Sequence, residues 1–290
     1  MIRSLLAVLL LAAAGASAVR ADETKHPIPE IKAALERMYS FDFQSAHRML
    51  DLYVASHPSE PLGPAFKASA YLFYEMDRMK ILEGEFLVND NRIKSNKRID
   101  PDPKVRELFY QNISLAEGLA AKRLQTSPND PSALFTLCMV EGMKTDYLAF
   151  IEKERMKSLS NAKQSQEHAI ELRKRVPEFY DALLTSGISE YMIGSLPFFV
   201  KWFIRFPETD GDKGKAIENL QTVSRKGYYM GPFARILLAI IHLREKQPLE
   251  AKKMLEILTK EYPANPLLKR EYEHLRLKYP DPAIRQVGQE

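Results

Sequence analysis

The side chains best suited to catalysis or metal binding are scattered along this 290-residue chain. Six histidines lie far apart, without the His-Glu-x-x-His spacing of a helical zinc site. They are His26, His47, His57, His168, His242 and His274. The single cysteine, Cys138, lies in an apolar stretch, where a thiol usually packs as a small hydrophobe. These residues predict no catalytic centre, no metal site and no cofactor.

A short acidic loop, Asp210-Gly211-Asp212-Lys213-Gly214, has the beginning of a calcium-binding pattern. The bidentate glutamate that such a loop needs would fall on Gln221, which is a poor ligand for this purpose. The loop is better interpreted as a turn and helix N-cap that precede a helix over 213–226. We therefore expect a non-enzymatic protein.

The segment from Ser195 to Pro207 is the densest aromatic stretch and contains the only tryptophan, Trp202. On a helical wheel its aromatic side chains form one arc, with Lys201 and Arg205 beside it. One interpretation is a membrane-surface helix or a contact for a partner protein. The other is a helix packed inside the protein. The second is favoured because interfacial helices have a wide polar face, and this segment has a narrow one.

Eighteen prolines divide the chain into pieces of helical length. Proline is tolerated at the start of a helix but not inside one, so these positions predict helix boundaries. Runs of alternating β-branched residues are absent, and we expect no sheet. The predicted helices are 28–39, 43–56, 62–83, 105–126, 132–147, 158–175, 178–193, 195–206, 213–226, 232–245, 249–262 and 267–279.

A repeating interval supports an array of similar helix pairs. An alanine precedes a proline by 12 positions at Ala46 and Pro58, at Ala116 and Pro128, and at Ala251 and Pro263. Ser165 and Pro177 repeat the interval with another small residue. The spacing of 35 residues between Ala216 and Ala251 indicates the period.

The unit from Pro232 to Asn265, two helical segments joined by a tight turn, resembles a tetratricopeptide repeat. The matching positions are Leu238, Ala239, Ala251 and Pro263. The departures are Arg235, His242 and Leu255, where the repeat usually has aromatic residues. The resemblance is clearest over 213–279. It implies a right-handed superhelical solenoid of antiparallel helix pairs, forming one domain over 22–290.

In such repeats the first helices of successive pairs line a peptide-binding surface, so the resemblance also implies binding residues. The corresponding positions in the last unit are Ile236, Ile240 and Leu243. A looser register over 180–193 adds Leu184, Ile188 and Tyr191. If exposed, these side chains would suit a hydrophobic or extended peptide. If the aromatic segment covers them, they belong to the core.

The first 21 residues have the composition of a secretory signal peptide, with Arg3, an apolar run and small residues before Asp22. Cleavage after Ala18 or after Ala21 fits the small-residue rule. The apolar run is shorter than the roughly 20 residues of a transmembrane helix. Removing two arginines leaves 40 basic against 38 acidic residues, from 42 and 38. This near-neutral balance argues against nucleic acid as a partner.

Together these features predict an exported scaffold or adaptor, periplasmic or secreted, that binds a protein or peptide partner in the cell envelope. Trp202 and Arg205 join the predicted binding residues through the aromatic segment. The alternative is a peripheral membrane protein attached through 196–206.

Overall fold

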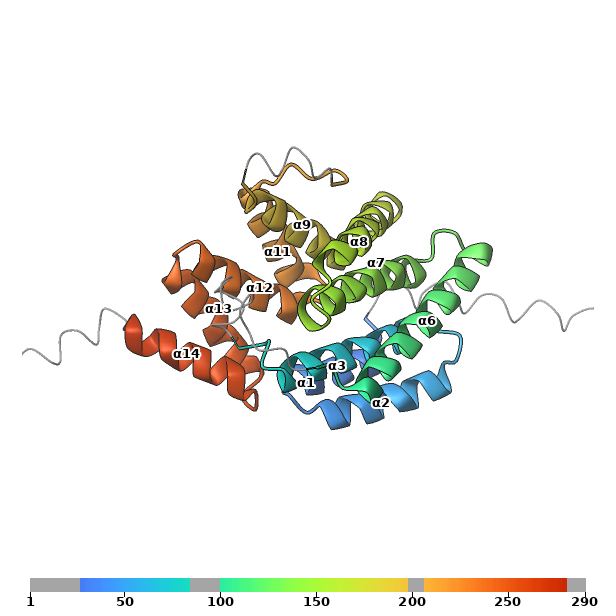
Figure 1. Cartoon of the computed structure of the whole chain (residues 1–290), viewed down its shortest axis with the longest axis horizontal. Helices are drawn as coiled ribbons and strands as arrows, with labels where there is room; N and C mark the ends of the chain where they lie inside the picture. The colour runs from blue at the N-terminus through green and yellow to red at the C-terminus, as the bar shows by residue number, and fades with distance from the viewer. Residues whose placement is uncertain (1–26, 84–99, 198–205, 281–290) are drawn as a thin grey trace, which may run out of the picture.

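A computed structural model describes residues 27–83, 100–197 and 206–280, and over these ranges the chain is all-helical (Figure 1). The α-helices are α1 (Pro29–Tyr39), α2 (Phe43–Ser56), α3 (Leu62–Arg78), α6 (Pro103–Thr126), α7 (Pro131–Asp146), α8 (Arg155–Arg175), α9 (Leu183–Gly194), α11 (Lys213–Lys226), α12 (Gly231–Arg244), α13 (Pro248–Glu261) and α14 (Pro266–Lys278). A π-helical turn (Tyr147–Ile151) follows α7, and a 3-10 turn (Tyr180–Ala182) precedes α9. None of the described helices is both long and apolar enough to span a membrane.

The prolines mark helix starts, as the sequence predicts. Proline occupies the first turn of α1, α6, α7, α12, α13 and α14. Its fixed φ suits that position, where its missing N–H removes no helical hydrogen bond. Side chains of Asp102, Asp130 and Asn265 cap three of these helices by accepting hydrogen bonds from backbone N–H groups. Local chemistry therefore sets most of the boundaries.

Some predicted bounds are wrong. The helix predicted over 62–83 ends at Arg78, and the one predicted from 178 begins as the 3-10 turn before α9. Helix α9 ends at Gly194, and Ser195–Pro197 do not continue it. The predicted aromatic helix lies largely outside the described residues. The predicted signal peptide lies entirely outside them.

Each helix packs against the next one along the chain. The alanines of the repeating interval lie at these contacts: Ala46, Ala116, Ala216 and Ala251 are all fully buried. A methyl side chain lets two helix backbones approach closely, whereas a larger one would force them apart. The burial of all four alanines is consistent with the repeating interval of the sequence.

The beginning and end of the described chain also touch. Tyr229, between α11 and α12, accepts a hydrogen bond from the Ile28 backbone N–H at 3.0 Å. Asn265, the N-cap of α14, donates through Nδ2 to the Tyr39 carbonyl oxygen at 2.6 Å. The rings of Tyr39 and Tyr262 lie 5.4 Å apart. The N-terminal end of α14 therefore lies beside α1 (Figure 1).

Aromatic rings fill the space between the early helices and the α11–α12 turn. The Tyr229 ring lies 5.2 Å from that of Phe66 on α3 and 6.1 Å from that of Phe135 on α7. Phe73 and Phe233 meet edge to face at 5.5 Å. Such pairs add about 0.5–1.5 kcal/mol each beyond their buried area. The first and last thirds of the chain thus share one core.

Candidate binding surface

The six predicted binding residues in the described ranges lie on α9 and α12. Five of them are half-buried: Leu184, Ile188, Ile236, Ile240 and Leu243. Tyr191 is buried. Leu184, Ile236 and Leu243 pack against the hydrophobic core, so part of each side chain already has a partner inside the protein. Trp202 and Arg205 lie outside the described residues.

A polar contact joins the ends of these two helices. The Tyr191 hydroxyl donates to Oε1 of Glu245, directly after α12, at 3.0 Å. Lys213 Nζ donates to the same oxygen at 2.6 Å and lies 5.4 Å from the centre of the Tyr191 ring. The Lys213 ammonium holds the pKa of Glu245 below its usual value. The contact ties Tyr191 on α9 and Lys213 at the start of α11 to the residue that follows α12. Helices α9 and α12 both pack against α11, which lies between them in the chain.

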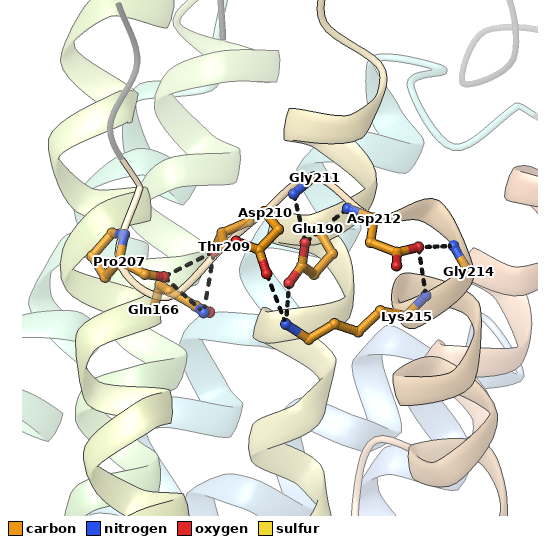
Figure 2. Close-up of polar contacts among 9 residues, drawn as sticks. All are labelled: Gln166, Glu190, Pro207, Thr209, Asp210, Gly211, Asp212, Gly214 and Lys215. Atoms are coloured by element: carbon orange, nitrogen blue, oxygen red, sulfur yellow. Dashed lines mark hydrogen bonds and ion pairs between the residues drawn. The ribbon is translucent and has the colours of Figure 1, made fainter. Parts of the chain in front are cut away.

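A second polar cluster holds the start of α11 (Figure 2). Glu190 on α9 is almost fully buried, and its Oε2 accepts the backbone N–H groups of Gly211 at 2.7 Å and Asp212 at 3.0 Å. Lys215 Nζ forms an ion pair with Oε1 at 2.7 Å. Asp212 caps α11 by accepting N–H groups of Gly214 and Lys215, which confirms the predicted N-cap. We call Glu190, Gly211, Asp212 and Lys215 the α9–α11 clasp.

The charge on Glu190 is favoured by its partners. Burial by itself would raise the pKa of this carboxyl, but the Lys215 ammonium and the two backbone N–H groups outweigh burial. The net result is a pKa below the usual value for glutamate. Beside the clasp, Gln166 Nε2 donates to the Pro207 carbonyl at 3.3 Å (Figure 2). Residues 207–212 are thus held at several points against α8 and α9.

The same arrangement occurs between α3 and α6. Glu75 on α3 is fully buried, and its Oε1 accepts the Asp102 backbone N–H at 2.7 Å. Asp102 caps α6 through the N–H groups of Lys104 and Val105. Arg78, one turn after Glu75, donates to both carboxylate oxygens at 2.7 Å. We call Glu75, Arg78 and Asp102 the α3–α6 clasp.

Neither buried glutamate was predicted from the sequence, although Glu190 carries a signal. It is the only charged residue in the apolar and small-residue stretch between Asp181 and Lys201, whereas Glu75 is closely followed by Asp77 and Arg78. A lone charge in such a stretch indicates a buried, partnered carboxylate. A third buried acid, Asp181, accepts backbone N–H groups of Tyr228, Tyr229 and Met230 at 2.7–3.0 Å. In each case the protein itself supplies the donors, and the carboxylates hold turns in place.

Asp146, at the end of α7, is different. Burial of its carboxyl raises the pKa to about 7, and no charge or hydrogen bond within the described ranges opposes that shift. Cys138 is buried, with its sulfur 3.3 Å from Thr185 Oγ1, and burial raises the pKa of the thiol. No three metal-ligating side chains gather within the described ranges. These groups do not form a catalytic constellation.

Comparison with known proteins finds no match to this chain among protein-family models, curated proteins or solved structures.

Proposed function

We propose that the protein is an exported, non-enzymatic scaffold or adaptor built from tetratricopeptide-like helix pairs in a right-handed superhelical solenoid. Its ligand is a protein or peptide partner in the cell envelope. The packing of each helix against the next supports this proposal, as does the complete burial of the alanines of the repeating interval. Stacked helix pairs leave extended surfaces open to a partner chain.

The observation that carries the proposal is the half-exposed aliphatic surface of α9 and α12. Ile188 and Ile240 are both partly buried, so each still offers apolar area to a ligand. The Tyr191–Glu245 contact fixes the two helices relative to each other before any partner binds. Fixed surfaces lose little conformational entropy on binding. An extended peptide with apolar side chains would remove the remaining exposed area from water.

Peptide binding by residues 22–290 tests this proposal. An immobilised library of extended decapeptides with apolar side chains is incubated with the unsubstituted protein and with Ile188→Ser and Ile240→Ser variants. We expect peptides selected by the unsubstituted protein to bind each variant about tenfold more weakly, from the loss of buried apolar area. Ile257→Ser is the control, since Ile257 lies exposed on α13.

Two results would overturn the proposal: failure of the unsubstituted protein to select any peptide, or equal weakening by the control. Circular dichroism of each variant shows whether its helices are intact. Export is tested separately by the mass of the protein recovered outside the cytoplasm, where cleavage after Ala21 gives a chain starting at Asp22.

A further inference from the structure

A groove of about 610 Å³ runs between α1 and the wall formed by α12 and the ends of α11 and α13. It is separate from the surface of the proposed peptide site. Lys32, Glu36 and Arg37 line it from α1, and Arg235 and Glu261 line it from the opposite wall. Its volume lies within the range of about 300–1,000 Å³ that is usual for ligand sites.

Both walls are fixed without a ligand. Asp181 holds the α11–α12 turn by accepting three consecutive backbone N–H groups. Helix α1 is tied at its start by the Ile28–Tyr229 hydrogen bond and at its end by the Tyr39–Asn265 hydrogen bond. The groove is therefore a built feature of the contact between the first and last helices. A ligand would meet it already formed.

Arg235 leaves one buried donor unused on the groove wall. Its Nη1 donates to the Ser224 carbonyl oxygen at 3.2 Å, and its Nη2 pairs with Glu261. Its Nε is buried and has no hydrogen-bond partner within the protein. A buried N–H without an acceptor costs about 1–3 kcal/mol, so a turn of the Arg235 side chain that brought Nε to an oxygen acceptor in the groove would relieve that cost.

The rest of the groove favours a negatively charged acceptor. Arg235 and Glu261 neutralise each other. Lys32 and Arg37 are exposed on α1, and neither forms an ion pair with another described residue. Glu36 is the remaining acid of the lining. Lys32 and Arg37 outnumber Glu36 in the groove, although the charge of Arg37 also acts on Asp42 outside it. This net positive charge and the unused Nε donor attract carboxylates.

We propose that this groove binds an acidic segment of a polypeptide partner, with one carboxylate accepting from Arg235 Nε and others facing Lys32 and Arg37. An aspartate or glutamate side chain supplies the negative acceptor, and its backbone supplies further acceptors for the tyrosine-lined wall at Tyr228 and Tyr262. This site is distinct from the apolar surface of α9 and α12 and does not depend on it.

The test is fluorescence anisotropy with a fluorescein-labelled acetyl-(Asp-Glu)₃-amide peptide at low salt. The matched neutral probe is the acetyl-(Asn-Gln)₃-amide peptide. We expect the acidic peptide to bind more tightly than the neutral one, and salt to weaken its binding. The double variant Lys32→Gln/Arg37→Gln should weaken binding of the acidic peptide roughly five- to tenfold. Lys104→Gln/Lys122→Gln removes two exposed cations of α6 and should leave binding unchanged.

Arg235→Lys keeps the positive charge and removes the Nε donor, so it should also weaken binding of the acidic peptide. If Arg235→Lys loses its helical circular dichroism, the test rests on the affinity of the Lys32→Gln/Arg37→Gln variant for the acidic peptide. Equal affinity for the two peptides, or equal loss in the α6 control, would overturn the proposal. Competition by inorganic phosphate that equals that of the peptide per unit charge would also overturn it. So would binding of the protein to anionic lipid vesicles that is lost in the Lys32→Gln/Arg37→Gln variant.

Discussion

The α3–α6 and α9–α11 clasps use the same parts with different connections. In both, a buried glutamate accepts the backbone N–H of the aspartate that caps the following helix. The cation of the first, Arg78, belongs to the same helix as Glu75. The cation of the second, Lys215, belongs to the helix being held. All three partners of Glu190 therefore lie in α11 or directly before it. Of the partners of Glu75, only Asp102 lies outside α3.

The comparison shows that a cation on the same helix can neutralise a buried carboxylate, as Arg78 does for Glu75, without linking that helix to another. Glu75 satisfies most of its needs through Arg78, and its contribution to the α3–α6 contact is the hydrogen bond from Asp102. Glu190 joins α9 and α11 through two N–H groups and an ammonium. Removing Glu190 should thus disturb the contact between its helices more.

The largest expected effect follows from Glu190→Ala. We expect a loss of about 2–3 kcal/mol in the free energy of unfolding, since two part-buried N–H groups and the half-exposed Lys215 ammonium lose their acceptor. Glu75→Ala should cost less, about 1–2 kcal/mol, because Arg78 can turn to solvent and one N–H loses its acceptor. Chemical denaturation measures both. Equal losses would show that crossing contacts do not set the difference.

A second prediction compares glycines of the two helix pairs. An added Cβ at Gly187 on α9 would lie 2.9 Å from Leu220 Cγ and 3.2 Å from the Ala216 carbonyl oxygen. Gly187→Ala should therefore force α9 and α11 apart and cost about 1–3 kcal/mol. Gly118 on α6 has open space around its Cβ position. Gly118→Ala should stabilise the protein by about 0.5–1 kcal/mol through helix propensity. A gain at both sites would contradict the close approach at Gly187.

A third prediction concerns the pH dependence of the α9–α11 clasp. Because the pKa of Glu190 is lowered in the folded protein, its stabilisation is present above the ordinary glutamate pKa of about 4.3 and is lost as pH falls through the folded value. Glu190→Gln should therefore cost more stability at pH 7 than at pH 3. Urea unfolding at the two pH values gives the difference. A constant cost would mean that the charge of Glu190 contributes nothing.

Asp146 should show the opposite sign. Its pKa is raised to about 7 by burial, so its carboxyl favours the folded state when protonated, and stability falls as pH rises from about 4 to about 7. Asp146→Asn should raise stability at pH 8 by about 1 kcal/mol and have little effect near pH 4. Thermal unfolding at both pH values measures this. A destabilised variant at pH 8 would show that the Asp146 charge is needed.

The sequence predicts the helices well because local chemistry controls where they start and stop. Residues 43–56 and 213–226 form α2 and α11 at the predicted bounds, and Asp212 is the predicted N-cap. The groove could not be predicted in this way. Lys32 and Arg235 line the same groove from helices at opposite ends of the chain, and no periodicity of the sequence reports a relation over such a separation.

The clasps lie between these two cases. Helical periodicity places Glu190 on α9, but its partners Gly211 and Asp212 lie about 20 residues later, beyond the segment that separates the two helices. The sequence marks Glu190 as an isolated charge, but it does not identify Gly211 and Asp212 as its hydrogen-bond partners. Arg235 is similar, since its partners, Glu261 on α13 and the Ser224 carbonyl oxygen on α11, lie on other helices.

The hydrogen bonds between α1 and the final helices join residues 201 and 226 positions apart. In an open array of repeats, contacts are local, and units can form or melt one after another. Contacts of such long range raise the contact order and slow folding, because a large loop must close before they form. During vectorial synthesis, α2 and α3 can pack on α1 early, but Ile28 and Tyr39 lack their late hydrogen-bond partners until the last helices have been made. Once closed, the first and last units are coupled and should unfold together.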